Sequence, residues 1–354
     1  MSSTQWIDTA GPQCEIVLST RIRLARNLEH YPFPSRNRAA NLADVVGLVS
    51  ARVREATSLK CHDVFRLHPL ELQLLVERHL VSPAFISSPF PRAIGIDETG
   101  TQSLMVNEED HLRIQSLVSG LDLQTAWEKS RELCSQLEGG LEFAYDHQFG
   151  YLTSCLSNVG TGMRASAMVH VPGLAYVQAL DAISQQVSCL GLTIRGLYGE
   201  GSSCSGHLVQ LSNQVTLGLS ERDILTKVET VCQQLLQYEH SARAQLMTNQ
   251  RNWLEDKCWR SFALLSSARI MTGEEALQHF SNLRLGVALE ILPGYLKPRL
   301  NRLLVNTRAA NLQMEAGREL SLEERDVVRA SVIRNLLSEN PQLPGSTGSG
   351  GTQG

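Results

Sequence analysis

The sequence lacks the features that mark membrane and secreted proteins. None of its apolar runs is long enough to span a bilayer, and the opening residues, MSSTQWIDTAGPQCE, have neither the basic nor the apolar region of a signal peptide. Its eight cysteines include no Cys-x-x-Cys pair. Cysteines without a secretory signal are typical of reduced thiols rather than of a disulfide framework. We therefore predict a cytoplasmic protein that does not enter a membrane.

Several common ligand-binding patterns are also missing. The ten histidines include no His-Glu-x-x-His or other metal-ligand spacing, so we expect no metal ion held by protein side chains. No Walker lysine motif occurs, which disfavours a P-loop nucleotide site. The net charge is −4, whereas generic nucleic-acid binding requires a basic excess. We therefore expect neither a structural metal nor a nucleic-acid partner.

The composition is that of a globular protein with room for a main domain and a smaller one. Hydrophobic residues make up 42% and charged residues 19% of the 354-residue chain. Segments typical of strands and helices mix up to about residue 243, and helical spacing alone follows. We predict an α+β catalytic domain over 1–243, an all-helical domain over 244–339 and a flexible tail over 340–354.

Hydrophobic periodicity predicts the elements of the first domain. Apolar residues at helical spacing favour helices over 39–59, 70–80, 121–137 and 174–190. Residues 92–107 are typical of a hairpin with its turn at 97–100, and strands are expected over 111–117, 192–195 and 207–211.

A glycine-containing stretch, 149–171, attracts attention because it places Gly160 and Gly162 just before Arg164. The glycines allow a tight turn and a close approach to a ligand, so a guanidinium fixed beside them is a candidate phosphate site. The same glycines, with Ala165, imitate the dinucleotide fingerprint. That fingerprint requires a helix after the turn, whereas alternation from Met163 predicts a strand, so a dehydrogenase is disfavoured.

Two further stretches add charge of both signs. Arg21 and Arg23 lie two residues apart, hence on one face of a predicted strand, where they suit neighbouring phosphates. Residues 107–113 (NEEDHLR) place three carboxylates and an arginine together at a strand end. Arginines for a polyphosphate and carboxylates for a cationic partner are typical of phosphoryl transfer to a basic acceptor. Taken singly, each arginine is better explained by a salt bridge, and the acids by a solvated turn. Taken together, the arginines favour the phosphate site, because each lies at a predicted strand or a glycine turn.

Four segments, in this order along the chain, resemble the signatures of the ATP:guanido phosphotransferases, the family of creatine and arginine kinases. They are residues 19–23, 107–113, 150–164 and 195–200, and the resemblance covers about 16–243. It implies that family's catalytic fold, an antiparallel sheet flanked by helices.

Within this family the chain is more similar to the bacterial protein-arginine kinase branch, McsB, than to the kinases of small metabolites. Only 18 residues precede Ser19, so we expect the helical N-terminal domain of the metabolite kinases to be absent. Residues 325–330 (RDVVRA) match the branch's Arg-Asp-x-x-Arg-Ala phosphoarginine-binding motif, which implies binding by Arg325, Asp326, Arg329 and Ala330. Ser321 and the acid three residues later predict a capped helix start there.

The resemblance also implies a role for residues at each motif position. Glu109 matches the catalytic carboxylate, Glu200 the second carboxylate that holds the acceptor guanidinium, and Cys155 the family's reactive cysteine. Leu156, where the family usually has proline, and Ser203-Cys204, in place of Glu-Ala, depart from the pattern. The implied nucleotide contacts are Ser19, Thr20, Arg21, Ile22, Arg23, His79, Arg113, Arg164, Ala165, Ser166, Ala167, Met168, Arg195, Gly196, Leu197, Tyr198, Gly199 and Glu200.

The function implied is transfer of a phosphoryl group from ATP to protein arginine, with Mg²⁺ bound through the ATP phosphates. The resemblance further implies protein substrates with exposed arginines, a role in marking them for a Clp-type protease, an activator protein and a homodimer through the helical domain. Two alternatives remain open. In the first, the chain is a kinase of a small guanidino metabolite such as arginine or creatine. In the second, it is an inactive phosphoarginine-binding adaptor.

Overall fold

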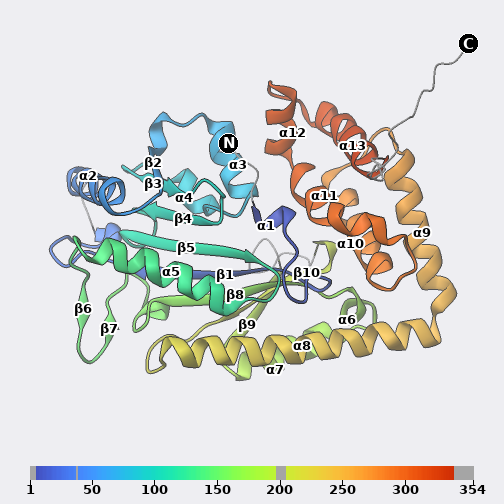
Figure 1. Cartoon of the computed structure of the whole chain (residues 1–354), viewed down its shortest axis with the longest axis horizontal. Helices are drawn as coiled ribbons and strands as arrows, with labels where there is room; N and C mark the ends of the chain where they lie inside the picture. The colour runs from blue at the N-terminus through green and yellow to red at the C-terminus, as the bar shows by residue number, and fades with distance from the viewer. Residues whose placement is uncertain (1–4, 37–38, 197–204, 339–354) are drawn as a thin grey trace, which may run out of the picture.

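The computed structural model describes residues 5–36, 39–196 and 205–338. Its centre is an eight-stranded antiparallel sheet in the order β2-β3-β4-β5-β1-β8-β10-β9 (Figure 1). β1 (Val17–Arg26) lies inside the sheet and pairs with both β5 (Leu112–Ser119) and β8 (Met163–His170). The other strands are β2 (Lys60–Asp63), β3 (Ala93–Ile96), β4 (Gln102–Val106), β9 (Leu192–Gly196) and β10 (Leu208–Asn213). The expected α+β class, a helix-flanked antiparallel sheet followed by helices, is confirmed.

Helices surround the sheet and then continue alone beyond it. Those of the sheet-containing part are α1 (Gln5–Asp8), α2 (Ala39–Ala56), α3 (Pro69–Glu77), α4 (Pro83–Ser87), α5 (Leu123–Glu138), α6 (Pro172–Tyr176) and α7 (Leu180–Cys189). The later helices are α8 (Glu221–Asn249), α9 (Arg251–Ser267), α10 (Gly273–Ala288), α11 (Leu300–Asn306), α12 (Ala309–Ala316) and α13 (Leu322–Ser338).

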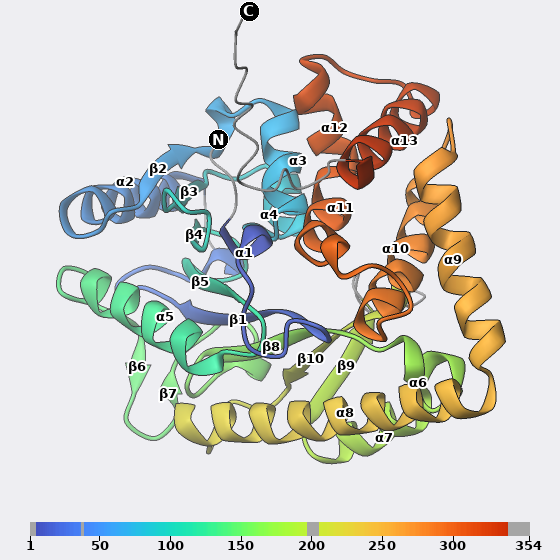
Figure 2. The same cartoon turned by 45° about the vertical axis from the view of Figure 1, so that its right-hand side comes forward.

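The sheet has one apolar face because its strands alternate. Ile22 and Leu24 of β1 lie opposite Ala165 and Met163 of β8, and all four are fully buried. Side chains directly opposite in an antiparallel pair point to the same side. This face forms the main hydrophobic core together with apolar residues of α2, α5 and α8, and α5 and α8 run along it in Figure 2.

The helical part has a hydrophobic core of its own. In α8 the apolar contacts change from the main core at Ala242 to the second core at Leu246, only four residues later. α9 rises from the end of α8 and packs beside α10 and α13 (Figure 2). One helix therefore contributes to both cores and joins them.

Most predicted elements of the first domain are confirmed, including α2, α3, α5 and the β3–β4 hairpin. The single helix predicted over 174–190 is wrong, because the segment forms α6 and α7 with a break between them. Gln178 has a φ of 57° at the break, in the left-handed region, which no residue adopts inside a right-handed helix.

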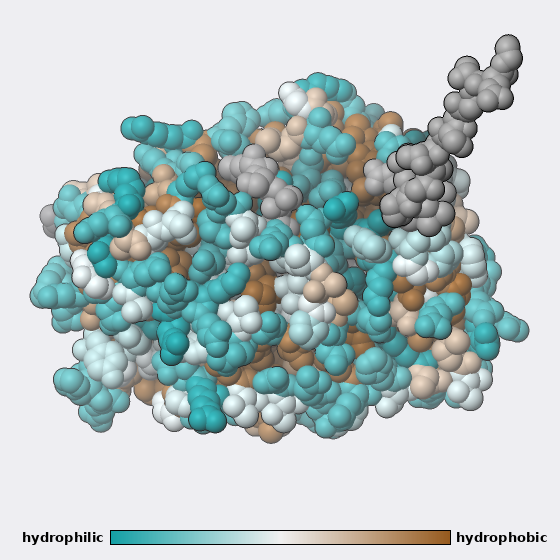
Figure 3. All heavy atoms as spheres, viewed as in Figure 1, coloured by the Kyte–Doolittle hydropathy of each residue, from teal (hydrophilic) through white to brown (hydrophobic). Residues whose placement is uncertain are grey.

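The face of the molecule shown in Figure 3 is mostly hydrophilic, with hydrophobic residues interspersed among charged and polar ones. Among the residues that the structure describes, no helix is both long and apolar enough to cross a membrane.

A buried ion pair fixes α6 to α8. The Glu239 carboxylate accepts hydrogen bonds from the backbone nitrogens of Gly173 and Leu174, both at 2.9 Å, and from Arg243 Nε at 2.6 Å. The side chain of Glu239 is fully buried and that of Arg243 is 4% exposed. The carboxylate therefore caps the start of α6 while it neutralises a buried cation.

We predict that Glu239→Gln lowers the free energy of unfolding by about 3 kcal/mol, because it leaves the Arg243 guanidinium buried without a counter-charge. The matched control is Glu255→Gln, which breaks an exposed pair with Arg251 of the same i,i+4 spacing. That variant should lose about 0.5 kcal/mol or less. Urea denaturation of both variants measures the difference, and equal losses would contradict the assignment.

Candidate active site

Five arginines from four strands lie on the sheet face opposite the main core. Arg21 and Arg23 alternate along β1, so both point away from Ile22. The register places the other three on the same side: Arg164 lies opposite Arg23, Arg113 opposite Ala25, and Arg195 opposite Gln210. The strand pairing thus brings together the five arginines that the sequence predicts as phosphate contacts.

These guanidiniums are packed closely enough to repel one another. Burial, with Arg113 and Arg164 nearby, lowers the pKa of Arg21 to about 9. Burial and the neighbouring arginines lower the pKa of Arg23 as well, and burial followed by Arg195 and Arg113 lowers that of Arg164. A guanidinium whose pKa is depressed in this way is one that the fold holds at a cost in free energy.

Two of the five arginines have neutral partners in the described part of the chain. Arg21 Nη2 donates to Gln210 Oε1 at 3.1 Å, and Arg164 Nη2 donates to Ser212 Oγ at 3.2 Å. In the part of the chain that the structure describes, the buried Arg23 Nε has no hydrogen-bond partner. Five clustered guanidiniums suit a ligand with several negative charges, such as a polyphosphate.

The acidic loop between β4 and β5 faces this cluster, and its first acid pairs with it. Glu108 accepts from Arg113 Nη1 at 2.5 Å and from Ser82 Oγ at 2.5 Å. Although burial alone would raise it, the pKa of Glu108 lies below its ordinary value because of Arg113 and these hydrogen bonds. Glu108 is therefore the permanent partner of Arg113.

The third acid, Asp110, has a structural role. It is 2% exposed. Its Oδ1 accepts from Asn27 Nδ2 and from the backbone nitrogen of Ser154, both at 2.7 Å. These bonds tie the acidic loop to β1 on one side and to the loop that carries Cys155 on the other.

Glu109 is the most exposed of the three acids and borders the arginine cluster. Partial burial and the charges of Asp110 and Glu108 raise its pKa. A cavity of about 260 Å³ opens between it and the cluster. The cavity is lined by Glu109 and Cys155 together with Arg23, Arg113, Arg164 and Arg195. A carboxylate with a raised pKa beside several cations is able to accept a proton from a group placed between them.

Cys155 precedes a short 3₁₀ turn, η3 (Leu156–Asn158). Its sulfur lies 3.0 Å from Ser157 Oγ, and Thr216 Oγ1 holds the turn by donating to the carbonyl of Ser157 at 2.9 Å. Leu156, which stands where proline was expected, has a side chain that is 87% exposed. The turn is therefore held by hydrogen bonds and does not require the proline ring.

His79 lies at the side of the cluster. Its ring centroid is 5.9 Å from that of Trp6, and its carbonyl accepts from Gln115 Nε2 at 2.7 Å. Burial, then Arg308 and Arg21, lowers the pKa of His79 to about 3, so the ring is neutral at physiological pH. A neutral ring next to the arginines can stack on or bond to a ligand without adding charge.

Several residues of the predicted nucleotide motifs have side chains that point away from the arginine cluster. Thr20, Ile22, Ala165 and Ala167 lie on the core side of the sheet and are fully buried, because alternate residues of a strand face opposite ways. Their side chains therefore support the strands from the core side, and their assignment as nucleotide contacts stays a prediction. Met168 and Ser19 are also buried, and Met168 packs against Leu304 of α11.

Other predicted residues divide into two groups. Ser166 and Gly196 lie on strands of the cluster, and Ser166 Oγ donates to the Arg21 carbonyl at 3.3 Å. Leu197, Tyr198, Gly199, Glu200, Ser203 and Cys204 lie outside the described residues.

Sequence reasoning missed the neutral partners Gln210 and Ser212. They alternate along β10, opposite residues of β8 on the cluster side. Polar residues at alternate positions of a predicted strand were a usable signal, but only the register shows that they meet Arg21 and Arg164.

The predicted phosphoarginine residues are not equivalent in the structure. Arg329 is 6% exposed and donates to the carbonyls of Thr307 and Met271 at 3.0 and 2.8 Å, and it also pairs with Asp326. It borders a cavity of about 700 Å³ between α3–α4 and α10–α12. Arg325 is partly exposed and does not line that cavity, although the predicted capping box of Ser321 is confirmed. Ala330 is in the second core.

Comparison with known families divides the chain in two. Residues 43–242 match the ATP:guanido phosphotransferase, C-terminal catalytic domain, and residues 251–346 match the protein-arginine kinase McsB C-terminal domain. The two matches together cover most of the chain.

Two similar proteins are named protein-arginine kinase. A protein-arginine kinase of Symbiobacterium thermophilum is 43% identical over 343 residues, which are 95% of this chain and 97% of that protein. One from Geobacillus stearothermophilus is 42% identical over 338 residues, 94% of this chain and 93% of its own.

Solved structures share the fold at lower identity. The duplicated taurocyamine kinase from Schistosoma mansoni, with bound transition state analog components, has a TM-score of 0.60 at 25% identity, over 66% of this chain and 35% of that longer one. Lombricine kinase has a TM-score of 0.59 at 22% identity, over 69% of this chain and 72% of its own.

We predict that Arg23→Met stabilises the protein without ligand but weakens binding of tripolyphosphate. Replacing a repelled, partly buried cation by an apolar side chain should raise the free energy of unfolding by about 1–2 kcal/mol. Losing one charged donor should weaken tripolyphosphate binding by about tenfold or more. Chemical denaturation and calorimetry measure the two effects. Arg251→Met, which alters an exposed arginine of α9, should change neither; a loss of stability in Arg23→Met would contradict the repulsion argument.

Proposed function

This chain belongs to the ATP:guanido phosphotransferase family, within it to the protein-arginine kinases, and on that premise we propose how its residues transfer the γ-phosphate of ATP to arginine side chains of proteins. The observation that carries the proposal is the cavity in which four repelled arginines meet Glu109. It combines the two things that the reaction needs, positive charge for the phosphates and a base for the acceptor.

The arginines hold the phosphates. Arg21, Arg23, Arg113, Arg164 and Arg195 project from rigid, paired strands, so their positions change little when ligand binds. The phosphates relieve the repulsion between the guanidiniums, and the charge that develops on the transferred group meets donors already in place. His79, neutral beside Arg21, is proposed to contact the nucleotide at the edge of this site.

ATP brings Mg²⁺ in this proposal. Among the described residues, no cluster of three or more His, Cys, Asp or Glu side chains is placed to hold a metal ion. Two of the three acids near the arginines are already engaged, since Glu108 pairs with Arg113 and Asp110 accepts from Asn27 and the backbone of Ser154. Mg²⁺ that arrives with the ATP would offset the negative charge of the phosphates.

The acceptor must lose a proton that it normally keeps, because a guanidinium has a pKa above 12. Glu109 is proposed as the base: it borders the cavity, and its raised pKa makes its carboxylate a better proton acceptor than an ordinary one. Glu200 is proposed from its motif position as the second carboxylate that holds the acceptor. Cys155, beside Glu109 in the cavity wall, is proposed to position the acceptor nitrogen rather than to attack the phosphate.

The family resemblance supports further proposals that concern partners. We infer protein substrates with exposed arginines, marking of these substrates for a Clp-type protease, an activator protein, a cytoplasmic location and a homodimer through the helical region. The division into domains at residues 243 and 244 is proposed on the change of hydrophobic core between Ala242 and Leu246.

We predict that Mg²⁺-ATP with casein gives phosphoarginine on the protein, whereas free arginine and creatine give no phosphorylated product. Mass spectrometry under non-acidic conditions measures this, because the N–P bond is labile to acid. Phosphorylated free arginine or creatine would place the chain with the metabolite kinases.

We predict that Glu109→Gln lowers kcat by about 10²–10⁴-fold, because the proton of the acceptor guanidinium loses the carboxylate that accepts it.

The pH profile provides the control for the base. A general base works only when deprotonated, so wild-type kcat should fall as the pH drops through the pKa of Glu109, which lies above the ordinary 4.5. Glu109→Gln should lose this dependence. Glu98→Gln, an exposed acid paired with Lys60, should keep both rate and profile. An unchanged kcat in Glu109→Gln would show that another group is the base.

For the phosphoarginine motif we predict different effects of its two arginines. Arg325→Ala should weaken phosphoarginine binding by about tenfold and leave stability unchanged, because its one hydrogen bond, to the Ser321 carbonyl, is exposed. Arg329→Ala should also lower the free energy of unfolding by about 3 kcal/mol, because it leaves two carbonyls and Asp326 without their donor. Calorimetry and denaturation separate the two effects. Unchanged phosphoarginine affinity in the double variant would refute the assignment.

A further inference from the structure

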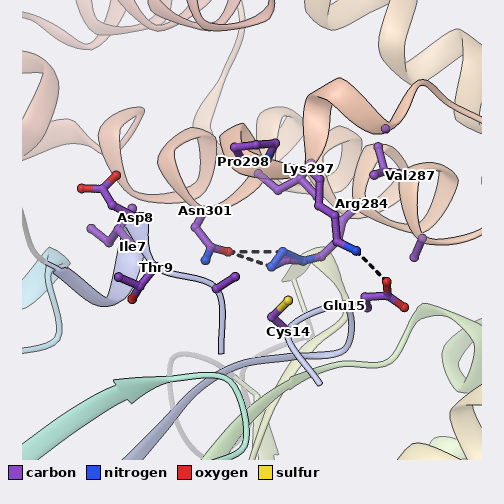
Figure 4. A pocket seen from close by; sticks show the side chains of 14 residues that line it. Ile7, Asp8, Thr9, Cys14, Glu15, Arg284, Val287, Lys297, Pro298 and Asn301 are labelled. Carbon is purple, nitrogen blue, oxygen red and sulfur yellow. Dashed lines mark hydrogen bonds and ion pairs between the residues drawn. The ribbon is translucent and has the colours of Figure 1, made fainter. Parts of the chain in front are cut away.

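A cavity of about 480 Å³ lies away from the arginine cluster, between the N-terminal segment and the helical region (Figure 4). One wall is formed by residues 7–10 with Cys14 and Glu15, and the other by α10 and residues 294–301. Its size falls in the ordinary range of small-molecule sites. Much of the lining is apolar, contributed by Ile7, Ala10, Val287, Ala288, Pro298 and Leu300.

Arg284 of α10 is the unusual member of this lining. It is 8% exposed. Its Nη1 and Nη2 atoms both donate to one neutral atom, Asn301 Oδ1, at 3.2 and 2.7 Å (Figure 4). Within the described part of the chain no carboxylate lies within ion-pair distance of it. Burial lowers the pKa of Arg284 to about 10, which reflects the cost of keeping this charge out of water.

The acids around the cavity do not supply the missing counter-charge. Glu15 pairs with Lys297 at 2.7 Å, and Asp8 pairs with Arg302 at 2.7 Å. Each acid thus has a cation of its own, and the charge of Arg284 is left over. Three of the five N–H groups of its guanidinium take no part in the two bonds to Asn301.

We propose that this cavity binds a small organic anion, one carboxylate or phosphate group on a short apolar body. The anionic group takes the free donors of Arg284 in the bidentate manner that guanidiniums favour, and the body lies against the apolar wall. Neither a cation nor an uncharged apolar molecule compensates the charge of Arg284, so both fit less well.

The position of the site indicates what its occupation would affect. The segment that forms one wall continues from α1, where Trp6 packs against the ring of His79 and Ile7 against Leu117 and Val305. A ligand held between this segment and α10 therefore fixes the element that supports His79, at the edge of the arginine cluster. The site is a separate one, since it shares no lining residue with the cavity at Glu109.

The test measures binding of hexanoate and hexyl phosphate to the full chain by calorimetry, with saturating Mg²⁺-ADP present so that the arginine cluster is occupied. Hexanamide, which has the same body without the charge, is the matched ligand control. We expect one molecule of at least one anion per chain, with hexanamide at least tenfold weaker. The stronger of the two anions identifies the anionic group as carboxylate or phosphate.

Variants locate the site. Arg284→Met should weaken binding of the anion at least tenfold, whereas Arg302→Met, which alters the exposed partner of Asp8, should leave it unchanged. Ala288→Phe keeps the guanidinium and adds volume within the cavity lining, so it should also weaken binding. This second variant decides the matter if Arg284→Met does not fold.

Three results would overturn the proposal. Equal binding of hexanoate and hexanamide would show that charge is not recognised. Wild-type anion affinity in both Arg284→Met and Ala288→Phe would place the anion elsewhere. Absence of binding by either anion at about 1 mM, the upper end of ordinary metabolite affinities, would leave Arg284 a structural partner of Asn301 only.

Discussion

The mutual repulsion of five arginines on one sheet face is the constraint that shapes this protein. A guanidinium cannot shed its charge at physiological pH, so the fold holds Arg21, Arg23 and their neighbours by rigid means. Central strands provide this rigidity, since β1 is paired on both sides along most of its length. The opposite face supplies the stabilisation, because the alternate residues Ile22 and Leu24 are fully buried in the main core. β1 therefore carries two of the repelled arginines on one face and, on the other, buried apolar residues that offset the cost of holding them.

The acidic loop depends on the same arrangement. Three consecutive carboxylates would repel one another if all were free, and the structure gives each a different environment. Glu108 is neutralised by Arg113, and Asp110 is held by Asn27 and the backbone of Ser154. The loop begins at Asn107, whose φ of 62° turns the chain and whose Nδ2 donates to the carbonyls of Leu42 and Pro91 at 2.9 Å. All three acids line the cavity, but Glu109 is the most exposed of them, and partial burial together with the two bound acids raises its pKa.

Local patterns predicted the faces of single strands but not how the strands meet. Alternation was enough to place Arg21 and Arg23 on one side, and a hairpin turn was enough to find β3 and β4. The pairing of Arg23 with Arg164 joins residues 141 positions apart, and no local signal encodes that register. Motif resemblance has the opposite limit: it marks whole segments, and so it includes Ile22 and Ala165, whose side chains lie on the core side of the sheet.

The helical region packs directly on the sheet face that carries the arginines. Leu304 of α11 and Leu277 of α10 pack on Leu18, Met168 and Leu208, at the end of the sheet face that the arginines leave apolar. Arg329, from the predicted phosphoarginine motif, holds the carbonyl of Thr307, and the next residue, Arg308, lies close enough to His79 to lower its pKa. Thr307 and Arg308 line the cavity beside Arg329, and Arg308 is also near His79. A helical region that only increased size would not need buried polar contacts at this boundary, whereas one that helps to position His79 and the ends of β1 and β8 would.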